Sequence, residues 1–218
     1  MNTKQSGIGM TSQRTRARMV ERLRSEGIRD EDVLEIMGSL PRHVFVDEAL
    51  ASRAYDDPPL PIGFGQTISS PWIVARMSEL LCQKGVPKKV LEIGTGCGYQ
   101  TAVLGKLCKD VFTVERIAPL LEKARTNLRG LKLSNVRFKY ADGNLGLEEV
   151  APFDGILMTA GATRVPLALL RQLAIGGRLV LPMGTDEQYL YVVERDTKGN
   201  SEKRYEAVRF VPLLPGLE

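Results

Sequence analysis

Three glycines spaced two residues apart, Gly94, Gly96 and Gly98, point most directly to chemistry in this chain. They follow an apolar, β-type run at 90–93 and precede a helix-like segment. Glycine tolerates a positive φ and has no Cβ, so the backbone can turn sharply and a ligand can lie against it. A strand ending in such a turn, at the carboxyl edge of a parallel sheet, is where α/β proteins hold nucleotide-like cofactors. A turn without a ligand is less favoured, because strand, turn and helix occur in the order that the motif requires.

The residues around these glycines favour S-adenosylmethionine over a dinucleotide. The dinucleotide fingerprint, G-x-G-x-x-G, has its third glycine one residue later than the G-x-G-x-G found here. Glu92 precedes the first glycine by two residues, and its carboxylate would repel a pyrophosphate but suit an ammonium group. S-adenosylmethionine has an amino acid at one end and no phosphate. We therefore expect its methionine part to be held by Glu92 and the backbone of Gly94, Thr95, Gly96 and Gly98.

Two acidic residues follow later strand-like runs. Glu115 ends the run 111–114, about twenty residues beyond the glycines, where a carboxylate accepts hydrogen bonds from ribose hydroxyls. Asp142 and Gly143 follow the run 136–140. The Asp142 carboxylate could accept a hydrogen bond from the adenine amine, although Asp-Gly is also an ordinary turn sequence.

The segment 55–71 is rich in proline and glycine, which argues against regular structure there. Long ordered loops of this kind usually carry function. At its end, Ser70 is expected to cap a helix over 72–81, with Pro71 at the first helical position. The hydroxyl of Ser69 is then left to face a ligand, or to act as a simple hydrogen-bonding group of the loop. Phe64 and Trp72 are expected to pack rather than to recognise a ligand.

The chain has a single histidine, His43, for which a surface role is favoured. A Ser-His-Asp triad, a Cys-His pair or a histidine-rich zinc site is therefore disfavoured, and the reaction should need little general-base help. The three cysteines, Cys82, Cys97 and Cys108, are odd in number and lack metal-ligand spacing. They indicate reduced thiols in a cytosolic protein and no metal site.

The composition limits which classes of protein the chain can belong to. At 218 residues and 43% hydrophobic the chain can bury one substantial core. No apolar run approaches the ~20 residues of a membrane span, and the polar start lacks a secretory signal. The net charge of +4 is dispersed, so a dedicated nucleic-acid partner is not indicated. We expect a cytoplasmic monomer without a membrane partner.

Strand-like and helix-like segments alternate after residue 90, which predicts an α/β fold. The sheet should be mostly parallel, doubly wound and Rossmann-like, with helices on both faces. Its strands are expected at 90–93, 111–114, 136–140, 155–159 and 178–181, followed by a C-terminal antiparallel hairpin at 189–194 and 205–211. Helices are expected at 13–25, after Asp30 and from Pro41, and again at 72–81, 100–107, 117–128 and 166–173.

The expected domain organisation is simple. Residues 1–12 should be a disordered extension, and residues 13–218 should form one domain. Within it, 13–70 would be a helical and substrate-loop segment, and 71–218 the cofactor-binding core.

From about Arg14 to Pro215 the chain resembles the protein-L-isoaspartate O-methyltransferase family. The most specific matches are the loop Leu60-Pro61-Ile62-Gly63 with 65–69, and the ending Ala207 to Leu213. The glycine motif within 91–103 is shared by most class I methyltransferases, and 114–117 also matches. The resemblance implies methyl transfer from S-adenosylmethionine, with S-adenosylhomocysteine as product, to the α-carboxylate of L-isoaspartyl residues in damaged peptides and proteins. Such a carboxylate is already ionised at neutral pH, in agreement with the lack of an obvious base.

The resemblance also implies roles for individual residues. Ser69 would be the catalytic residue, donating its hydroxyl to the acceptor carboxylate or orienting it. The implied cofactor set adds Thr67, Ile68, Arg116, Gly143 and Thr159 to the residues already named. The implied peptide-binding wall consists of Leu60, Pro61, Ile62, Gly63, Gln66, Val211, Pro212 and Leu213.

The sequence departs from the family pattern at a few positions. Cys97 stands in place of a serine, Ala141 in place of a glycine, and Asn144 in place of an aromatic residue.

A nucleic-acid methyltransferase is disfavoured because 159–162 lacks an Asn/Asp-Pro-Pro-aromatic segment. An NAD-dependent oxidoreductase is disfavoured by the glycine spacing. A cofactor-binding module without catalysis is excluded only by an assay.

Overall fold

The computed structural model describes residue 7 and residues 9–218, so the disorder expected for residues 1–12 lies largely outside the described residues. Within them, Gly9–Thr11 forms a short 3-10 turn, η1, rather than an irregular segment. Ser12 then caps α2 (Gln13–Ser25) by accepting a hydrogen bond from the backbone N–H of Thr15. Asp30 caps α3 (Glu31–Ser39) in the same way, as the sequence predicts.

The third N-terminal helix differs from the prediction. In place of one helix from Pro41, the chain makes two short 3-10 helices, η2 (Arg42–Phe45) and η3 (Glu48–Arg53). Neither helix has a side-chain cap on its first backbone N–H groups. Since 3-10 hydrogen bonds have poorer geometry than those of an α-helix, such pieces stay short and depend on tertiary contacts.

The proline-rich segment contains a hairpin, so the prediction of no regular structure at 55–71 is wrong. Strand β1 (Leu60–Gly63) pairs antiparallel with β2 (Gln66–Ile68) as a sheet of two strands. Proline is tolerated here because an edge strand has N–H positions that need no partner. The two residues that connect the strands, Phe64 and Gly65, both have positive φ (53° and 66°). Positive φ at both central positions is the property of the tight turns that match the twist of a hairpin.

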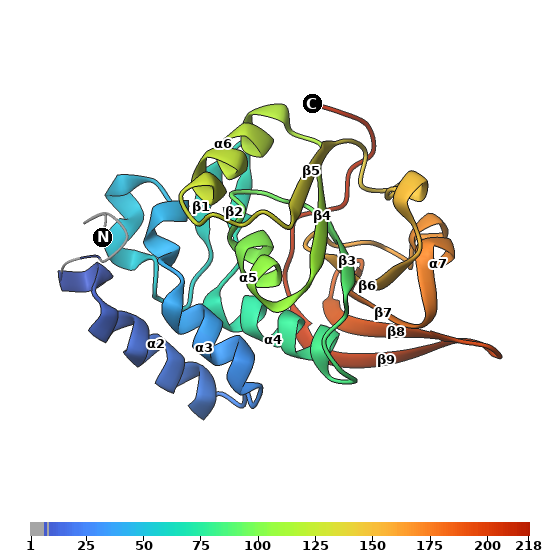
Figure 1. The fold of residues 1–218 in the computed structure, drawn as a ribbon, viewed down its shortest axis with the longest axis horizontal. Coiled ribbons are helices and arrows are strands. Elements are labelled where there is room, and N and C mark those ends of the chain that lie inside the picture. Colours follow the sequence, from blue (N-terminus) through green and yellow to red (C-terminus); the bar gives the residue numbers. More distant parts are fainter. Residues whose placement is uncertain (1–6, 8) are drawn as a thin grey trace.

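The main sheet of the described residues has seven strands in the order β5-β4-β3-β6-β7-β8-β9 (Figure 1). Their bounds are β3 (Lys89–Ile93), β4 (Asp110–Glu115), β5 (Val136–Tyr140), β6 (Phe153–Met158), β7 (Leu173–Gly184), β8 (Gln188–Asp196) and β9 (Gly199–Val208). The strands from β5 to β7 in this order are parallel, and β8 and β9 add an antiparallel hairpin. The predicted sheet is confirmed. Strand β7 starts earlier than expected, and β9 ends at Val208, so the chain leaves the sheet before residue 211.

Helices cover both faces of the sheet, as predicted. They are α4 (Pro71–Cys82), α5 (Tyr99–Leu107), α6 (Ala118–Arg129), α7 (Leu167–Gln172) and the 3-10 turn η4 (Glu148–Val150). Val90 and Leu157 share a core with residues of α4 and α5, whereas Leu91 and Ile156 share one with Leu169 of α7. Neighbouring residues thus face opposite sides, as a β-strand requires. The N-terminal helices α2 and α3 lie at the opposite end of the molecule from the β8–β9 hairpin (Figure 1).

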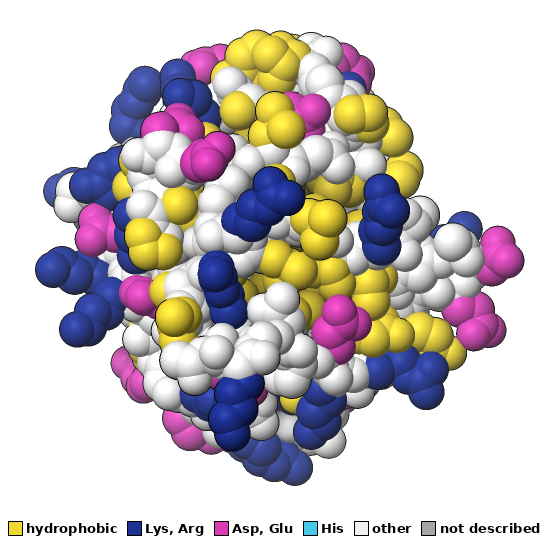
Figure 2. Space-filling view, turned by 90° about the vertical axis from the view of Figure 1, so that its right-hand side faces the viewer, with side chains coloured by type: hydrophobic (Ala, Val, Ile, Leu, Met, Phe, Trp, Pro, Cys, Tyr) yellow, Lys and Arg dark blue, Asp and Glu magenta, His cyan; other side chains and the backbone are white. Residues whose placement is uncertain are grey.

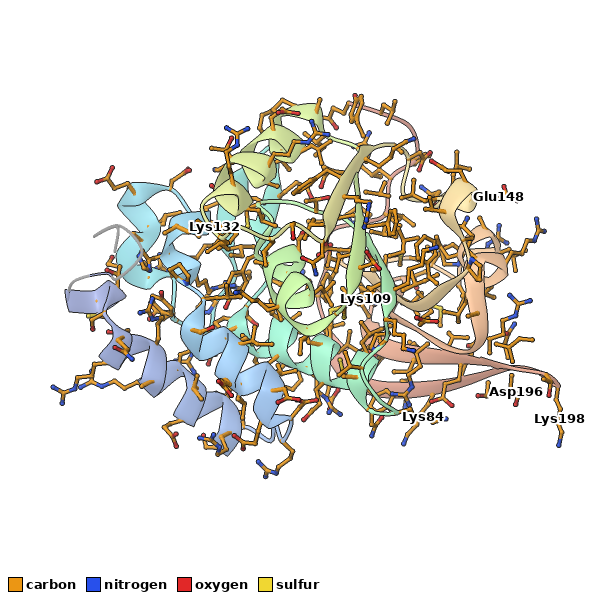
Figure 3. The ribbon with its side chains drawn as sticks, viewed as in Figure 1. Lys84, Lys109, Lys132, Glu148, Asp196 and Lys198 are labelled. Atoms are coloured by element: carbon orange, nitrogen blue, oxygen red, sulfur yellow. The ribbon has the colours of Figure 1, made fainter. Side chains whose placement is uncertain are left out.

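Charged side chains are spread over the surface. Asp196 and Lys198 project from the tip of the β8–β9 hairpin, and Lys84 and Glu148 from other edges of the molecule (Figure 3). On the face seen in Figure 2, hydrophobic side chains gather in a central band with scattered lysines and arginines around it. The described helices are too short or too polar to cross a bilayer.

Candidate active site

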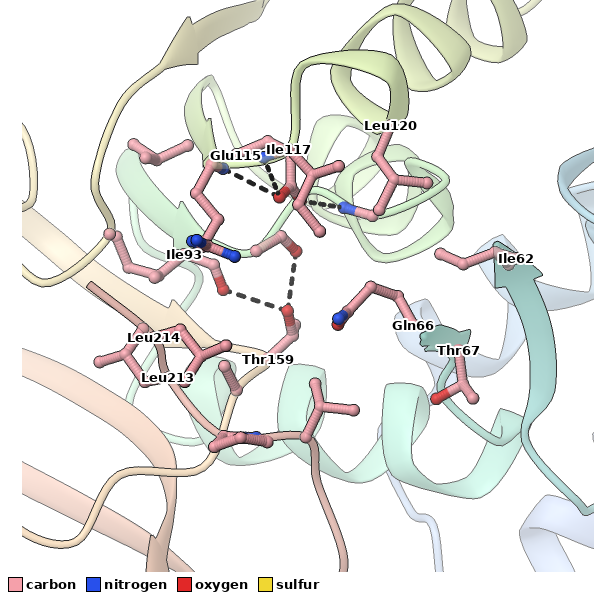
Figure 4. Close-up of a pocket in the computed structure, with 18 residues that line it drawn as sticks. Ile62, Gln66, Thr67, Ile93, Glu115, Ile117, Leu120, Thr159, Leu213 and Leu214 are labelled. Carbon is pink, nitrogen blue, oxygen red and sulfur yellow. Dashed lines mark hydrogen bonds between the residues drawn. The ribbon is translucent and has the colours of Figure 1, made fainter. Parts of the chain in front are cut away.

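A cavity opens where β3 and β4 end. The strand order reverses between β3 and β6, and such a switch point is where open α/β sheets bind ligands. Six segments line the cavity: the β1–β2 hairpin, the glycine turn, the end of β4 with the start of α6, Gly143 after β5, residues 159–160 after β6, and the C-terminal segment 211–214 (Figure 4). The sequence-predicted residues that line it are Ile62, Gln66, Thr67, Gly94, Gly96, Glu115, Arg116, Gly143, Thr159, Val211, Pro212 and Leu213.

A smaller recess shares Thr67, Gly94, Gly96 and Thr159 with this cavity. The further predicted residues that line the recess are Ile68, Ser69 and Thr95. The structure therefore brings the glycine turn and Ser69 together, although about 25 positions of sequence separate them.

Gly94 and Thr159 fit against each other at the mouth of the recess. Gly94 has φ of 94°, and a Cβ added to it would lie 2.3 Å from the Thr159 Oγ1. That oxygen donates to the carbonyls of Gly94 at 2.7 Å and Ile93 at 3.1 Å (Figure 4). Both the positive φ and the close approach require glycine at this position.

Gly98 has a packing role instead. It does not line the cavity, and a Cβ there would lie 2.3 Å from Leu128 of α6. Its φ of 90° allows the chain to enter α5.

Glu115 is fixed in the cavity wall by three backbone N–H groups. Its Oε2 accepts from Gly96 at 2.8 Å, and its Oε1 accepts from Arg116 at 2.9 Å and Ile117 at 3.0 Å (Figure 4). A carboxylate offers about four acceptor positions. One position is thus left for a ligand hydroxyl, in keeping with the expected ribose contact.

Glu92 lies elsewhere than expected. It is fully buried, lines neither the cavity nor the recess, and accepts hydrogen bonds from Thr101 and Thr113, both at 2.6 Å. Burial raises the pKa of Glu92 to about 8, although these two hydrogen bonds lower it. The expectation that Glu92 contacts the ammonium group directly is therefore corrected. The Thr113 hydroxyl lies 2.6 Å from that of Thr95, so Glu92 instead supports the turn from behind.

Asp142 is also occupied by the protein itself. Its Oδ1 accepts from the backbone N–H and side-chain amide of Asn144, and its Oδ2 accepts from the backbone N–H of Gly216. Burial alone would raise the pKa of Asp142, but these hydrogen bonds lower it. Asp142 lines a separate surface hollow and not the cavity, whereas Gly143 does line the cavity. The turn alternative describes Asp142 better than the adenine contact.

The predicted helix cap at Ser70 is confirmed, and Ser69 takes no part in it. The Ser70 hydroxyl accepts from the backbone N–H of Ile73 at 3.3 Å and caps α4, and Pro71 occupies the first helical position. The Ser69 hydroxyl forms no hydrogen bond within the described residues, and Ser69 lines the recess. The Ser69 carbonyl accepts a hydrogen bond from Arg42.

The hairpin contributes only part of the expected peptide-binding wall. Ile62 and Gln66 line the cavity, and the Gln66 side chain points into it (Figure 4). Leu60 is 2% exposed and belongs to the core shared with α2 and α3, so its role is packing. Pro61 and Gly63 are exposed but do not line the cavity. Phe64 is 54% exposed, so the expectation that it packs is wrong.

The C-terminal segment closes the far side through its backbone. The N–H of Gly161 donates to the carbonyl of Val211 at 2.7 Å, and the N–H of Leu213 donates to the carbonyl of Gly161 at 2.8 Å. These contacts hold 211–213 beside Thr159, as a wall of the cavity.

Sequence reasoning missed several lining residues. They are Ile93, Val114, Ile117, Leu120, Ala160 and Leu214 in the cavity, and Val74, Cys97, Tyr99 and Gln100 in the recess. Most are apolar, so they read as core positions. Their place in the chain could have identified two of them, because Ile93 and Val114 are at or next to the carboxyl ends of adjacent parallel strands, where ligands bind.

Two further expectations concern single residues. His43 is 8% exposed, and its Nδ1 lies 2.7 Å from the Tyr55 hydroxyl, so the favoured surface role is wrong. Cys97 lies in the recess, where burial raises the pKa of its thiol to about 11 and keeps it protonated. Among the described residues, no three His, Cys, Asp or Glu side chains gather as metal ligands would.

Comparison with known proteins shows the family to which the chain belongs. The family model described as protein-L-isoaspartate(D-aspartate) O-methyltransferase (PCMT) matches residues 14–218. The protein-L-isoaspartate O-methyltransferase of Methylobacillus flagellatus is 64% identical over 215 residues, covering 97% of this chain and 96% of the relative. The protein-L-isoaspartate O-methyltransferase of Dechloromonas aromatica is 62% identical over 213 residues, covering 97% of this chain and 99% of the relative.

Solved structures show the same similarity. A protein-L-isoaspartate O-methyltransferase structure has a TM-score of 0.82 at 28% identity, covering 93% of this chain and 67% of that chain. A Plasmodium falciparum structure named as a PCMT, in complex with S-adenosyl-L-homocysteine, has a TM-score of 0.80 at 28% identity, covering 90% and 97%. By fold, by sequence and by the match over residues 14–218, the chain belongs to the protein-L-isoaspartate(D-aspartate) O-methyltransferase family.

Proposed function

We propose that the cavity holds the adenosine part of S-adenosylmethionine and that the recess beside Ser69 holds the acceptor carboxylate. The chain is a methyltransferase that methylates L-isoaspartyl residues, with S-adenosylmethionine as cofactor and S-adenosylhomocysteine as product. The observation that carries the residue assignment is the shared lining. Gly94, Gly96 and Thr159 border both the cavity and the recess, so the two ligands would meet there.

The residues present fit such a cofactor. The cavity is lined mostly by apolar side chains with a few polar groups among them, as small-molecule sites are. Glu115 presents a fixed acceptor for ribose, and Ile93, Ile117 and Leu120 supply apolar walls for an adenine ring. The glycine turn leaves room for the methionine part, since no side chain projects from Gly94 or Gly96.

The chemistry then needs placement more than proton transfer. S-adenosylmethionine supplies an electrophilic methyl group on a sulfonium. A carboxylate oxygen of the isoaspartyl residue forms the new O–C bond, and the sulfur keeps the electron pair of the S–C bond that breaks. Ser69 donates its hydroxyl to the acceptor carboxylate and orients it. Holding the reacting atoms ~3–3.5 Å apart and in line is the main contribution available to such a site.

The product prepares a repair step that needs no further residue. Methoxide leaves more readily than hydroxide, so the neighbouring peptide nitrogen closes a succinimide on the esterified carboxyl. Hydrolysis of the succinimide returns part of the material to the normal aspartyl linkage.

We further propose that the protein acts as a cytoplasmic monomer on isoaspartyl peptides and proteins, without a dedicated nucleic-acid partner. Its three cysteines are free and buried, which suits a reducing compartment. The lysines and arginines are dispersed along the sequence, and on the face seen in Figure 2 they are scattered.

The test is methylation of a matched pair of peptides that differ only in an isoaspartyl or an aspartyl linkage. Labelled methyl groups from S-adenosylmethionine should appear as a base-labile ester in the isoaspartyl peptide alone. Equal labelling of both peptides would remove the specificity, and no labelling of either would remove the activity.

A further inference from the structure

Arg42 carries a buried charge without a counter-ion. Its side chain is 0% exposed, and Nε and Nη2 donate at 2.6 Å to the carbonyls of Ala54 and Ser69. The guanidinium lies over the ring of Tyr99, with 4.7 Å from Cζ to the ring centroid. Among the described residues Arg42 forms no salt bridge, and the ionisable groups near it are Tyr99, Cys97 and Tyr55 rather than a carboxylate.

Another buried arginine shows the usual arrangement. Arg178 is 6% exposed, and its Nε donates to the Glu194 carboxylate at 2.9 Å. A buried charge that lacks an opposite charge destabilises a fold. Folding therefore accounts for Arg178, whereas two carbonyls and an aromatic ring compensate the charge of Arg42 only in part. The Nη1 of Arg42 and the hydroxyl of Tyr99, both buried, also lack hydrogen-bond partners of good geometry.

The position of Arg42 relative to the recess is specific. Its hydrogen-bond partner Ser69 and the ring partner Tyr99 both line the recess, as does the nearby Cys97. The guanidinium therefore contacts the backbone of Ser69 from outside the recess, which Arg42 itself does not line. No substrate has to touch it for its charge to act, because charge–charge interactions are strong where water is excluded.

We propose that Arg42 is a positioning residue for methyl transfer: its buried guanidinium holds the Ser69 carbonyl in place, and its only partly compensated positive charge makes the recess select an anionic acceptor. This inference rests on the proposed acceptor site beside Ser69 and adds the reason why that site prefers a carboxylate to a neutral group. Once the carboxylate becomes a methyl ester the attraction is lost, which favours release of the product.

The test compares binding of two peptides to the enzyme saturated with S-adenosylhomocysteine. One has an isoaspartyl residue, and the other has a carboxamide in place of its α-carboxylate. Arg42→Met keeps much of the side-chain volume and removes the charge. Arg42→Lys keeps the charge but cannot donate to the carbonyls of both Ala54 and Ser69 in the same geometry. Arg178→Met is the matched control at another buried arginine. Unfolding temperature and affinity for S-adenosylhomocysteine report on the fold and the cofactor site.

The wild type should prefer the carboxylate peptide, and Arg42→Met should reduce that preference about tenfold by weakening the carboxylate peptide alone. Arg42→Lys should keep most of the preference but lower kcat about tenfold, because Ser69 is held less firmly. Arg178→Met should lower the unfolding temperature without changing the preference.

An unchanged preference in Arg42→Met, or an equal loss in Arg178→Met, would overturn the inference. If Arg42→Met does not fold, the Arg42→Lys variant tests both roles. An unchanged kcat in Arg42→Lys would contradict the role of Arg42 in holding Ser69. A lost preference for the carboxylate peptide in this variant, which keeps the positive charge, would contradict the role of that charge. Failure of the proposed function is distinguishable, since the wild-type enzyme would then neither methylate nor prefer the isoaspartyl peptide.

Discussion

The Glu115 carboxylate accepts a hydrogen bond from the backbone N–H of Gly96 at 2.8 Å and so joins the end of β4 to the glycine turn. The same side chain receives the N–H groups of Arg116 and Ile117 at the entrance to α6. Glu115 is thus oriented before any ligand arrives. A ribose hydroxyl can occupy the remaining acceptor position or replace the N–H of Gly96.

Glu115→Gln should weaken binding of S-adenosylhomocysteine about 10- to 100-fold, since a hydrogen bond to a charged acceptor contributes ~1.5–3 kcal/mol. Isothermal titration calorimetry measures the change. Glu122→Gln, an exposed change on α6 where Glu122 pairs with Arg125, is the control and should bind as the wild type does. Unchanged affinity in Glu115→Gln would contradict the ribose role.

Ser69→Ala should lower kcat for an isoaspartyl peptide by at least tenfold and change affinity for S-adenosylhomocysteine little, because only the acceptor loses a hydrogen bond. Ser70→Ala should instead lower stability by ~1 kcal/mol, since it removes the cap of α4. Steady-state kinetics and thermal unfolding of the two variants separate these effects. If Ser70→Ala loses turnover and Ser69→Ala loses stability, the two roles are reversed.

Glu92→Gln should change how stability depends on pH. The folded state raises the pKa of Glu92 from 4.5 to about 8, so it holds a proton that the unfolded chain releases. This contribution is complete below pH ~4.5 and is lost as pH rises towards ~8, with a slope approaching ~1.4 kcal/mol per pH unit. The wild type should therefore lose stability relative to Glu92→Gln across this window. Denaturant unfolding at several pH values measures the difference, and parallel curves would show that Glu92 is ionised in the folded protein.

Phe64→Asn should stabilise the protein by ~1 kcal/mol, because asparagine tolerates the φ of 53° better than phenylalanine does. Phe64→Ala is the matched control, since it also removes the exposed ring but keeps a residue unsuited to positive φ. Differential scanning calorimetry should show a higher unfolding temperature for Asn than for Ala. Equal temperatures would mean that the turn relaxes without strain.

Local patterns in the chain were sufficient for much of the fold and part of the site. The β3–glycine turn–α5 unit, the acid at the end of β4 and the serine cap of α4 depend on contacts within a few residues or on strand periodicity. The hairpin β1–β2 was missed because its prolines suggested irregular structure, whereas an edge strand can accept them.

The amino-acid sequence by itself determined the order of the main strands and α-helices along the chain after residue 70, the glycine turn, and the chemistry of an acceptor that is already ionised. Only the tertiary structure decided which polar groups face the ligands. Glu92 shares the side of β3 that carries Val90 and meets Thr101 of α5, Asp142 is bound by Gly216, and Arg42 donates to the carbonyl of Ser69. The physical reason is that a side chain's partners are set by what packs across from it, and those residues come from distant parts of the chain.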